Sequence, residues 1–420
     1  MSKTVRIVMY ALSLLTVIGV LAALVVAGGK KGTTQTMQQT AVQQEEQKTE
    51  DQSGQTGGPE DLQTAVRPEE TDEENQAPQG TIAATEETDG QKVASGQQEE
   101  EKTEDQSEQT GDTTTIIFTG DVLFANAFKA GYDANGINGV VSEELLQELN
   151  GADILMINNE FPFSDNGVPM EDKQFTFRCS PSYVTALQEM GVDVVSLANN
   201  HTLDYGKQAL LDTFQTLDGA GILYGGAGET AERAEEVQKI TVNGRTYGFI
   251  AVSRVVPTAD WKVENSTPGL FSCYDETRLL EVVKKAKESC DYVAVYPHWG
   301  VEYAAYPETY QTDIAQKCIE AGTDVVVGAH THCLQGVSYI EGKPVCYSLG
   351  NFVFGQSIDR SAILKVTVDA SGNATYQFLP VYATGGVTYL ATGDQAAQIL
   401  NYLNGISSDA TVGTDGSITQ

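Results

Sequence analysis

From residue 113 onward, short apolar runs alternate with segments of helical periodicity. The runs at residues 114–119, 153–157, 192–197, 291–296 and 324–327 are rich in β-branched residues and have the length of buried strands. Strands that alternate with helices in this way are typical of α/β folds with parallel sheets. The first part of the pattern therefore predicts an α/β domain.

The segments between these runs repeat apolar residues every three to four positions, which predicts helices. The predicted helices cover residues 143–149, 181–190, 207–217, 276–287 and 309–321. Hairpin turns are expected at Asn243-Gly244, Glu341-Gly342 and residues 371–373, where polar residues and glycine separate alternating strands. Together these elements predict one domain over residues 113–406, with a two-sheet core flanked by helices, followed by a flexible tail at 407–420.

A different pattern opens the chain. Residues 7–27 form an apolar run about long enough to span a bilayer, with Lys3 and Arg6 before it and Lys30-Lys31 after it. The run is long for the core of a cleaved signal peptide, which favours an uncleaved anchor within residues 1–31. We expect a single-pass protein of the cell membrane with its domain outside, or a secreted protein if the segment is cleaved.

Residues 32–112 are of low complexity and nearly lack large apolar side chains, so we expect a disordered, acidic stalk. The motif at residues 48–53 recurs at 102–107. The 420-residue chain has 58 Asp and Glu against 25 Lys and Arg, and this segment carries much of the excess. Such an acidic chain is not expected to bind nucleic acid, which calls for basic patches.

The chain has only four histidines, His201, His298, His330 and His332, and all follow apolar, strand-like runs. Ligands of α/β sheets bind outside the carboxyl ends of the strands. If residues 330–332 are extended, the two imidazoles point to the same side. The histidine positions therefore predict a shared metal site.

Three more polar residues follow predicted strands: Asp121, Glu160 and Asn200. Carboxylate, amide and imidazole ligands suit one or two divalent ions of Mn, Fe or Zn. A bridging carboxylate would allow two ions, an arrangement used to hydrolyse phosphate esters. Alternatively, Asp121 caps a turn, Glu160 is a surface acid and Asn200 satisfies loop backbone.

His201 adjoins Asn200 and is the candidate catalytic residue, as an acid toward a leaving group or as a stabiliser of developing negative charge. Asp204 and Glu302 are expected to support the ligands or to be loop residues, and Trp299 is expected to pack or, at the mouth of the site, to contact substrate. The six cysteines form no close-spaced pairs and read mostly as core residues, with Cys333 the one candidate for an extra ligand.

Six ordered motifs within residues 114–354 resemble the signatures of the CapA family of poly-γ-glutamate capsule proteins. They are Gly120-Asp121-Val122, Asn158-Asn159-Glu160, residues 198–206, residues 298–303, residues 328–332 and residues 348–352. That family is similar to calcineurin-like metallophosphatases, which implies a four-layer α-β-β-α sandwich with a two-metal centre. By this resemblance the metal ligands are Asp121, Glu160, Asn200, His298, His330 and His332, and His201 is the catalytic histidine.

The chain departs from the metallophosphatase pattern at three positions. Leu123 stands where those enzymes carry a histidine, Glu160 where they carry an aspartate, and Thr202 where an acid follows the Asn-His pair. The missing histidine predicts one weakened metal site or a single ion.

Three functions follow from these observations. The resemblance implies a membrane-anchored extracellular component of poly-γ-glutamate synthesis or export, with the polymer and membrane-bound synthase subunits as partners. The alternatives are a secreted metal-dependent hydrolase of a phosphoester or γ-glutamyl amide, and a non-catalytic polymer-binding scaffold.

Overall fold

The computed structural model describes residues 113–264 and 266–420, which include every candidate site residue. The predicted membrane segment at 7–27 and the predicted stalk at 32–112 lie outside the described residues. Within the described part, no helix has both the length and the apolar character needed to cross a membrane.

The larger sheet has ten strands in the order β17-β18-β15-β14-β1-β2-β3-β4, with β13 beside β1 and β16 beside β15. Its strands are β1 (Thr114–Val122), β2 (Ile154–Asn159), β3 (Val194–Ser196), β4 (Leu223–Gly225), β13 (Asn351–Val353), β14 (Ile358–Val368), β15 (Ala374–Thr384), β16 (Val387–Leu390), β17 (Thr411–Val412) and β18 (Ser417–Thr419). Strands β1 to β4 and β13 are parallel, whereas β14 and β15 are antiparallel additions.

The second sheet has six strands in the order β11-β12-β10-β9-β7-β6. They are β6 (Gln238–Val242), β7 (Arg245–Ser253), β9 (Tyr292–His298), β10 (Val325–Val327), β11 (Leu334–Ile340) and β12 (Lys343–Leu349). The hairpins predicted at Asn243-Gly244 and Glu341-Gly342 are confirmed, and all four residues have the positive φ that tight hairpin turns require. A small third sheet pairs β5 (Ala227–Gly228) with β8 (Gly269–Leu270).

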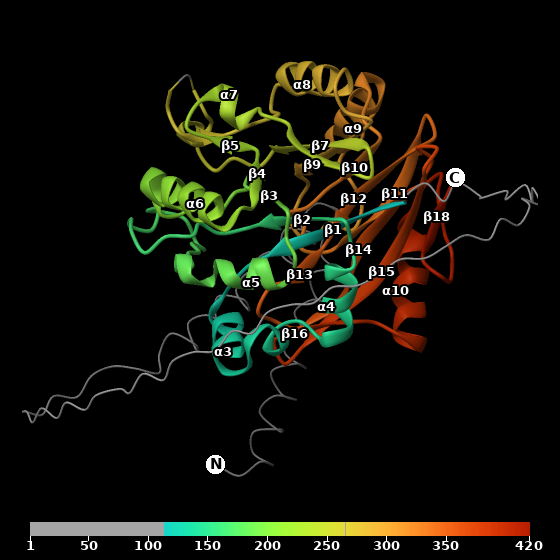
Figure 1. Cartoon of the computed structure of the whole chain (residues 1–420), viewed down its shortest axis with the longest axis horizontal. Coiled ribbons are helices and arrows are strands. Elements are labelled where there is room, and N and C mark those ends of the chain that lie inside the picture. The colour runs from blue at the N-terminus through green and yellow to red at the C-terminus, as the bar shows by residue number, and fades with distance from the viewer. Residues whose placement is uncertain (1–112, 265) are drawn as a thin grey trace, which may run out of the picture. The chain divides into compact units, whose positions relative to one another are not determined.

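Helices cover the outer faces of the two large sheets (Figure 1). The α-helices of the described residues are α3 (Asn126–Asn135), α4 (Glu143–Asn150), α5 (Val184–Glu189), α6 (Gly206–Ala220), α7 (Ala231–Ala234), α8 (Thr277–Lys287), α9 (Thr309–Ala321) and α10 (Gly393–Ile406). Unlike the helices on the outer faces, α10 packs its buried residues into the core between the sheets. Helices α3 to α6 share one core with the larger sheet, and α8 and α9 share another with the smaller sheet. A third core lies between the sheets, so the predicted two-sheet core flanked by helices is confirmed.

The prediction of a flexible tail at residues 407–420 is wrong. Strand β17 pairs with β18, and β18 continues the larger sheet by pairing with β15. Val412 and Ile418 are buried in the core between the sheets. Strands of two and three residues are too short to show periodicity in the sequence, and they are ordered here by tertiary burial.

The parallel strands bring the polar loops of both sheets together. The Tyr296 hydroxyl of the second sheet donates to the Thr119 carbonyl of the first at 2.6 Å. The Asp121 amide donates to the Gly350 carbonyl at 3.0 Å, which ties the end of β1 to the chain that leaves β12. Residues at the carboxyl ends of the parallel strands in both sheets therefore lie close together.

Gly328, which leads from β10 to the histidine loop, has no room for a side chain. An added Cβ would lie 2.1 Å from the Tyr347 carbonyl oxygen and 2.3 Å from Trp299 Nε1. We predict that Gly328→Ala lowers the free energy of unfolding by about 3 kcal/mol, because the backbone must shift to relieve the overlap. Denaturant unfolding measures this loss. Gly219→Ala in α6 is the control, because nothing lies near its added Cβ, and a stability of Gly328→Ala equal to that control would contradict the prediction.

Candidate metal centre

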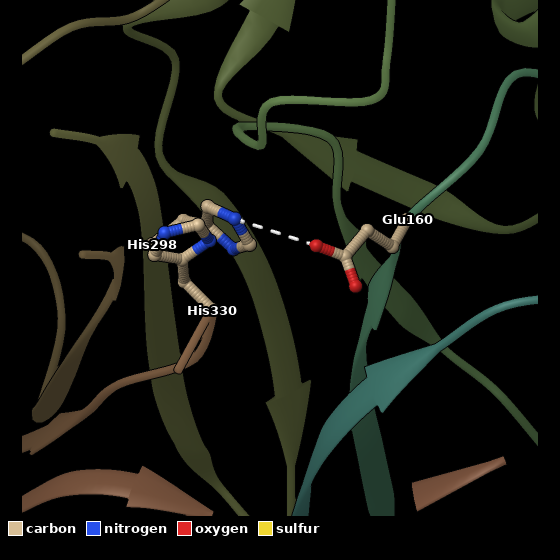
Figure 2. A group of neighbouring side chains, drawn as sticks. All are labelled: Glu160, His298 and His330. Carbon is tan, nitrogen blue, oxygen red and sulfur yellow. Dashed lines mark ion pairs between the residues drawn. The ribbon is translucent and has the colours of Figure 1, made fainter. Parts of the chain in front are cut away.

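One group of potential ligands joins the two sheets. Glu160 follows β2, His298 ends β9, and His330 lies in the loop after β10. One ligand atom from each of these buried residues lies within 4.8 Å of the others. Figure 2 shows the Glu160 carboxylate facing the two imidazole rings, with its Oε1 3.5 Å from His298 Nε2. Segments more than 130 residues apart in the chain thus provide a compact set of oxygen and nitrogen donors.

A second group shares Glu160 with the first. Its other members are Asp121 at the end of β1 and His332, and their ligand atoms also lie within 4.8 Å of one another. His332 Nδ1 is 3.5 Å from Asp121 Oδ2. Glu160 thus belongs to both groups of candidate ligands.

Several side-chain atoms of these residues lack a hydrogen-bond partner, as expected at a site that binds a cation. Both carboxylate oxygens of Glu160 and the Nδ1 of His330 are buried without a hydrogen-bond partner. Burial and the neighbouring Asp121 charge raise the pKa of Glu160 well above its usual range. Buried polar groups normally have partners, and those left without one in a folded protein point to a ligand or ion. The chemistry of the donor set thus matches a metal centre.

The histidine pKa values differ in a way that follows from their neighbours. Burial lowers the pKa of His298 and His330 well below the usual value, so both rings are neutral at pH 7 and able to ligate. Burial also opposes the charge on His332, yet the carboxylates of Asp121 and Glu160 raise its pKa to about 10. The protonated His332 thus supplies part of the positive charge that the acids require.

Asparagines hold the ligands in place. The Oδ1 of Asn200 lies 2.7 Å from His298 Nε2, which places this amide oxygen next to the first group. The Nδ2 of Asn158 donates to Asp121 Oδ1 at 2.8 Å and lies 3.3 Å from His298 Nδ1. Asn199 in turn donates to the Asn158 oxygen, and Asn351 Oδ1 lies 2.8 Å from His332 Nδ1. The sequence reasoning assigned no role to Asn158, Asn199 or Asn351, although each stands at a strand exit.

His201 is oriented by two charged neighbours. Its Nδ1 lies 2.7 Å from Asp204 Oδ2, and Lys173 forms an ion pair with the other oxygen of that carboxylate. Lys173 also donates to the Asn200 carbonyl oxygen. The Phe177 ring packs on the imidazole with centroids 4.6 Å apart. Burial lowers the pKa of His201, and because Nδ1 faces Asp204, Nε2 is the ring nitrogen left to exchange a proton.

Lys173 is the residue of this group that the sequence did not reveal. It lies in the irregular segment between β2 and α5, far from any strand end, and has no periodic or motif signal. Asp204 lies directly behind His201, as expected for a supporting residue.

His330 and His332 both reach the candidate ligand groups, but not through the extended loop that was predicted. His330 and His332 have φ values of 98° and 56°, so the loop is not extended and simple alternation does not apply. The His330 amide is 3.3 Å from both oxygens of Asp121, and the Thr331 hydroxyl donates to the Cys333 carbonyl. These contacts hold a left-handed turn that sends the two imidazoles to different ligand groups.

The remaining candidates fall in different places. Trp299 is fully buried in the core under α8 and α9 and donates to the Tyr347 carbonyl at 2.9 Å, so a contact with substrate is wrong for this residue. It follows His298 in the sheet, and successive strand residues face opposite sides.

Glu302 is half-buried near the centre. It raises the pKa of Glu160, although burial and Asp121 raise that pKa more. Cys333 belongs to neither ligand group, its thiol facing the Ala304 carbonyl, and all six cysteines are free.

Several known proteins are similar to this chain in sequence. Residues 115–356 match the family model described as bacterial capsule synthesis protein PGA_cap. The chain is 28% identical over 282 residues to the PGA biosynthesis protein CapA of Bacillus subtilis, with 64% of this chain and 72% of that protein covered. It is 30% identical over 282 residues to the capsule biosynthesis protein CapA of Bacillus anthracis, covering 64% and 67%.

A search of solved structures finds a putative 5'-nucleotidase from Staphylococcus aureus, with 15% identity and a TM-score of 0.42. The match covers 67% of this chain and 55% of the nucleotidase. The family match includes both ligand groups and spans more than half of the chain. This chain belongs to the bacterial capsule synthesis protein family PGA_cap.

Proposed function

We propose that this protein acts in poly-γ-glutamate capsule biosynthesis and that it does so through a catalytic centre of two divalent ions. Membership of the PGA_cap family and the names of its CapA relatives support the role in capsule biosynthesis. The observation that carries the catalytic part is Glu160, whose buried, unpartnered carboxylate belongs to both ligand groups.

The two ions are Mn, Fe or Zn, because the ligands are carboxylates, an amide and imidazoles without a thiolate. Glu160, Asn200, His298 and His330 would hold one ion, and Asp121, Glu160 and His332 would hold the other. Such ions, when bound, activate water and polarise the bond to be hydrolysed.

The residues around His201 favour catalysis over a purely structural role. Asp204 Oδ2 accepts a hydrogen bond from Nδ1 of the ring, which fixes the tautomer. Nε2 is then left to donate a proton to the leaving group. A polymer-binding scaffold would not need a buried histidine oriented by both an acid and Lys173. The proposed reaction is hydrolysis of a phosphoester or of a γ-glutamyl amide in the polymer or its precursors.

The proposed location of the protein rests on the sequence alone. We infer that residues 7–27 anchor the chain in the cell membrane and that residues 32–112 tether the folded domain on the extracellular side. This location would place the domain beside membrane-bound synthase subunits and the emerging polymer.

The shared carboxylate leads to a prediction about metal content. The wild-type protein should bind two ions per chain. His298→Ala and His332→Ala should each reduce this to one, because each removes a ligand from one group only. Glu160→Gln should abolish both, and elemental analysis of protein purified without chelator measures the number. Glu148→Gln, which changes an acid paired with Lys365 away from the centre, is the control. Two ions retained in Glu160→Gln would refute the shared site.

Metal affinity should rise with pH. In the metal-free protein His332 has a pKa of about 10 and is protonated at neutral pH, so an ion must displace that proton. Between pH 6 and 8 we expect at least about tenfold tighter binding per pH unit, because His332 releases one proton and Glu160, whose pKa burial and Asp121 raise, adds to the release while it is protonated. His298 and His330 contribute no proton there because burial lowers their pKa values. Calorimetry in buffers of different ionisation enthalpy counts the protons, and an affinity independent of pH would contradict this account.

A variant of His201 would distinguish a catalytic role of the protein from a role as a scaffold. We predict that His201→Ala keeps two ions per chain but slows the reaction by about 10²- to 10⁴-fold, the usual effect of losing a proton-transfer residue. Capsule output from cells that carry only this variant should fall to the level of a deletion strain. Thr216→Ala in α6, whose hydroxyl only bonds its own helix, is the control. Normal capsule from His201→Ala would favour the scaffold.

A further inference from the structure

The chain that follows β9 makes a tight turn beside the metal centre. The Ala304 amide donates to the Val301 carbonyl at 3.1 Å, which makes Glu302 and Tyr303 the central residues of this turn. Tyr303 has a φ of 62°, a left-handed value that such turns normally assign to glycine. Backbone strain of this kind persists only where the surrounding structure enforces it, and it clusters at functional sites. The turn is therefore a candidate for a functional element.

Contacts with the histidine loop enforce this turn. The Tyr303 amide donates to the Thr331 carbonyl at 2.7 Å. Gln335 is buried, and its Nε2 donates to the Ala304 carbonyl at 2.9 Å and to the Tyr306 carbonyl at 3.1 Å. Because Thr331 stands between the two ligand histidines of that loop, these bonds give the turn a fixed place beside the metal ligands.

The ring of Tyr303 lies against a member of the second ligand group. Its centroid is 5.9 Å from the centroid of the His332 ring, and the Phe354 ring lies 5.0 Å from the same imidazole. Tyr303 is half-buried, so part of its side chain is open to solvent. The face of an aromatic ring attracts cations, because the ring carries its negative charge there.

Glu302 adds a negative charge beside the same centre. The residue is half-buried and forms no ion pair with a cation of the described residues. Burial and Asp121 have larger effects on the pKa of Glu160 and of His332, but the charge of Glu302 raises both. Burial lowers the pKa of Lys173, and Glu302 acts against that shift. The Glu302 carboxylate is therefore within electrostatic reach of both ligand groups and of the lysine beside the candidate catalytic histidine.

An acid in this position distinguishes the two substrates considered above. A phosphoester carries its negative charge on the reacting group, so Glu302 would repel it. A γ-glutamyl amide with a free amino end instead carries an ammonium group a short carbon chain away from the amide carbonyl. A carboxylate and an aromatic ring both attract an ammonium group, and two neighbouring residues of one turn provide them.

We propose that Glu302 and Tyr303 form a subsite that binds a free ammonium group of the substrate, so that the centre acts on an amide with an amino end rather than on a phosphoester. This inference rests on the proposed function, because it names the substrate class of that same centre. The Glu302 carboxylate accepts hydrogen bonds from the ammonium group, and the Tyr303 ring packs over it. Water then adds to the amide carbonyl carbon and the C–N bond breaks, which gives a carboxylate and an ammonium product.

The first test is binding of two small ligands to the full-length protein in detergent, measured by titration calorimetry with chelator present. The ligands are γ-glutamyl-glutamate and glutaryl-glutamate, which has hydrogen in place of the amino group. Chelator makes the result independent of bound metal and of catalysis. The wild type should bind the amine at least about tenfold more tightly, the usual value of a hydrogen-bonded charge pair. Glu302→Gln should remove this preference, whereas Glu320→Gln, the same change at an exposed position of α9, should keep it.

A second variant tests the ring. Tyr303→Leu keeps an apolar side chain at the same backbone position but removes the aromatic face, and it should reduce the preference for the amine severalfold. Equal affinity of the wild type for the two ligands would overturn the proposal, as would a preference that survives Glu302→Gln. A preference for the amine in a protein that binds no metal, or whose His201→Ala variant makes normal capsule, would refute the proposed function and leave the subsite standing.

The metal-loaded protein provides an independent readout. It should hydrolyse γ-glutamyl p-nitroanilide, which has a free amino group, faster than p-nitrophenyl phosphate. Glu302→Gln should raise the KM for the anilide more than it lowers kcat, because the subsite binds a part of the substrate that does not react. Faster hydrolysis of the phosphoester by the wild type would overturn the proposal.

Discussion

A carboxylate buried without a hydrogen-bond donor is the constraint around which this domain is built. Glu160 is inaccessible to solvent, and neither of its oxygens has a partner among the described residues. Burying a charge in this way costs on the order of several kcal/mol unless an opposite charge accompanies it. The protonated His332 supplies one positive charge, but the same group holds a second acid, Asp121. The metal-free centre is therefore electrostatically incomplete, and the surrounding fold must stabilise it.

The fold meets this cost with two kinds of support. Three apolar cores hold the sheets and helices together and fix the strand ends from which the ligands project. A layer of asparagines then fixes the ligands: Asn158 bonds Asp121, and Asn199 bonds Asn158. Neutral amides orient acids and imidazoles without adding charge, which suits a site where charge is already unbalanced. Left-handed φ values at His330 and His332 store further strain at the same place.

The sequence predicted what depends on local pattern. Strand exits are visible as apolar runs that end in polar residues, and this alone located Asp121, Glu160, Asn200 and the four histidines. The roles of Asn158 and Lys173 depend instead on tertiary register. Asn158 contacts Asp121 because β2 pairs with β1 in parallel, and Lys173 reaches Asp204 from an irregular segment. The short strands β17 and β18 escaped prediction for the same reason, since only their partner β15 makes them strands.

Leu123 shows how a departure from a motif can be absorbed by the structure. A leucine in place of the first-motif histidine predicted one weakened metal site. The leucine side chain is buried in the core shared with α3 to α6, on the outer side of the larger sheet. The second ligand group is nonetheless complete with three residues, because His332 approaches Asp121 and Asn351 fixes its ring. The loss of one imidazole therefore leaves Asp121, Glu160 and His332 as the candidate ligands of the second group, and a weakened second site stays a prediction that metal analysis can test.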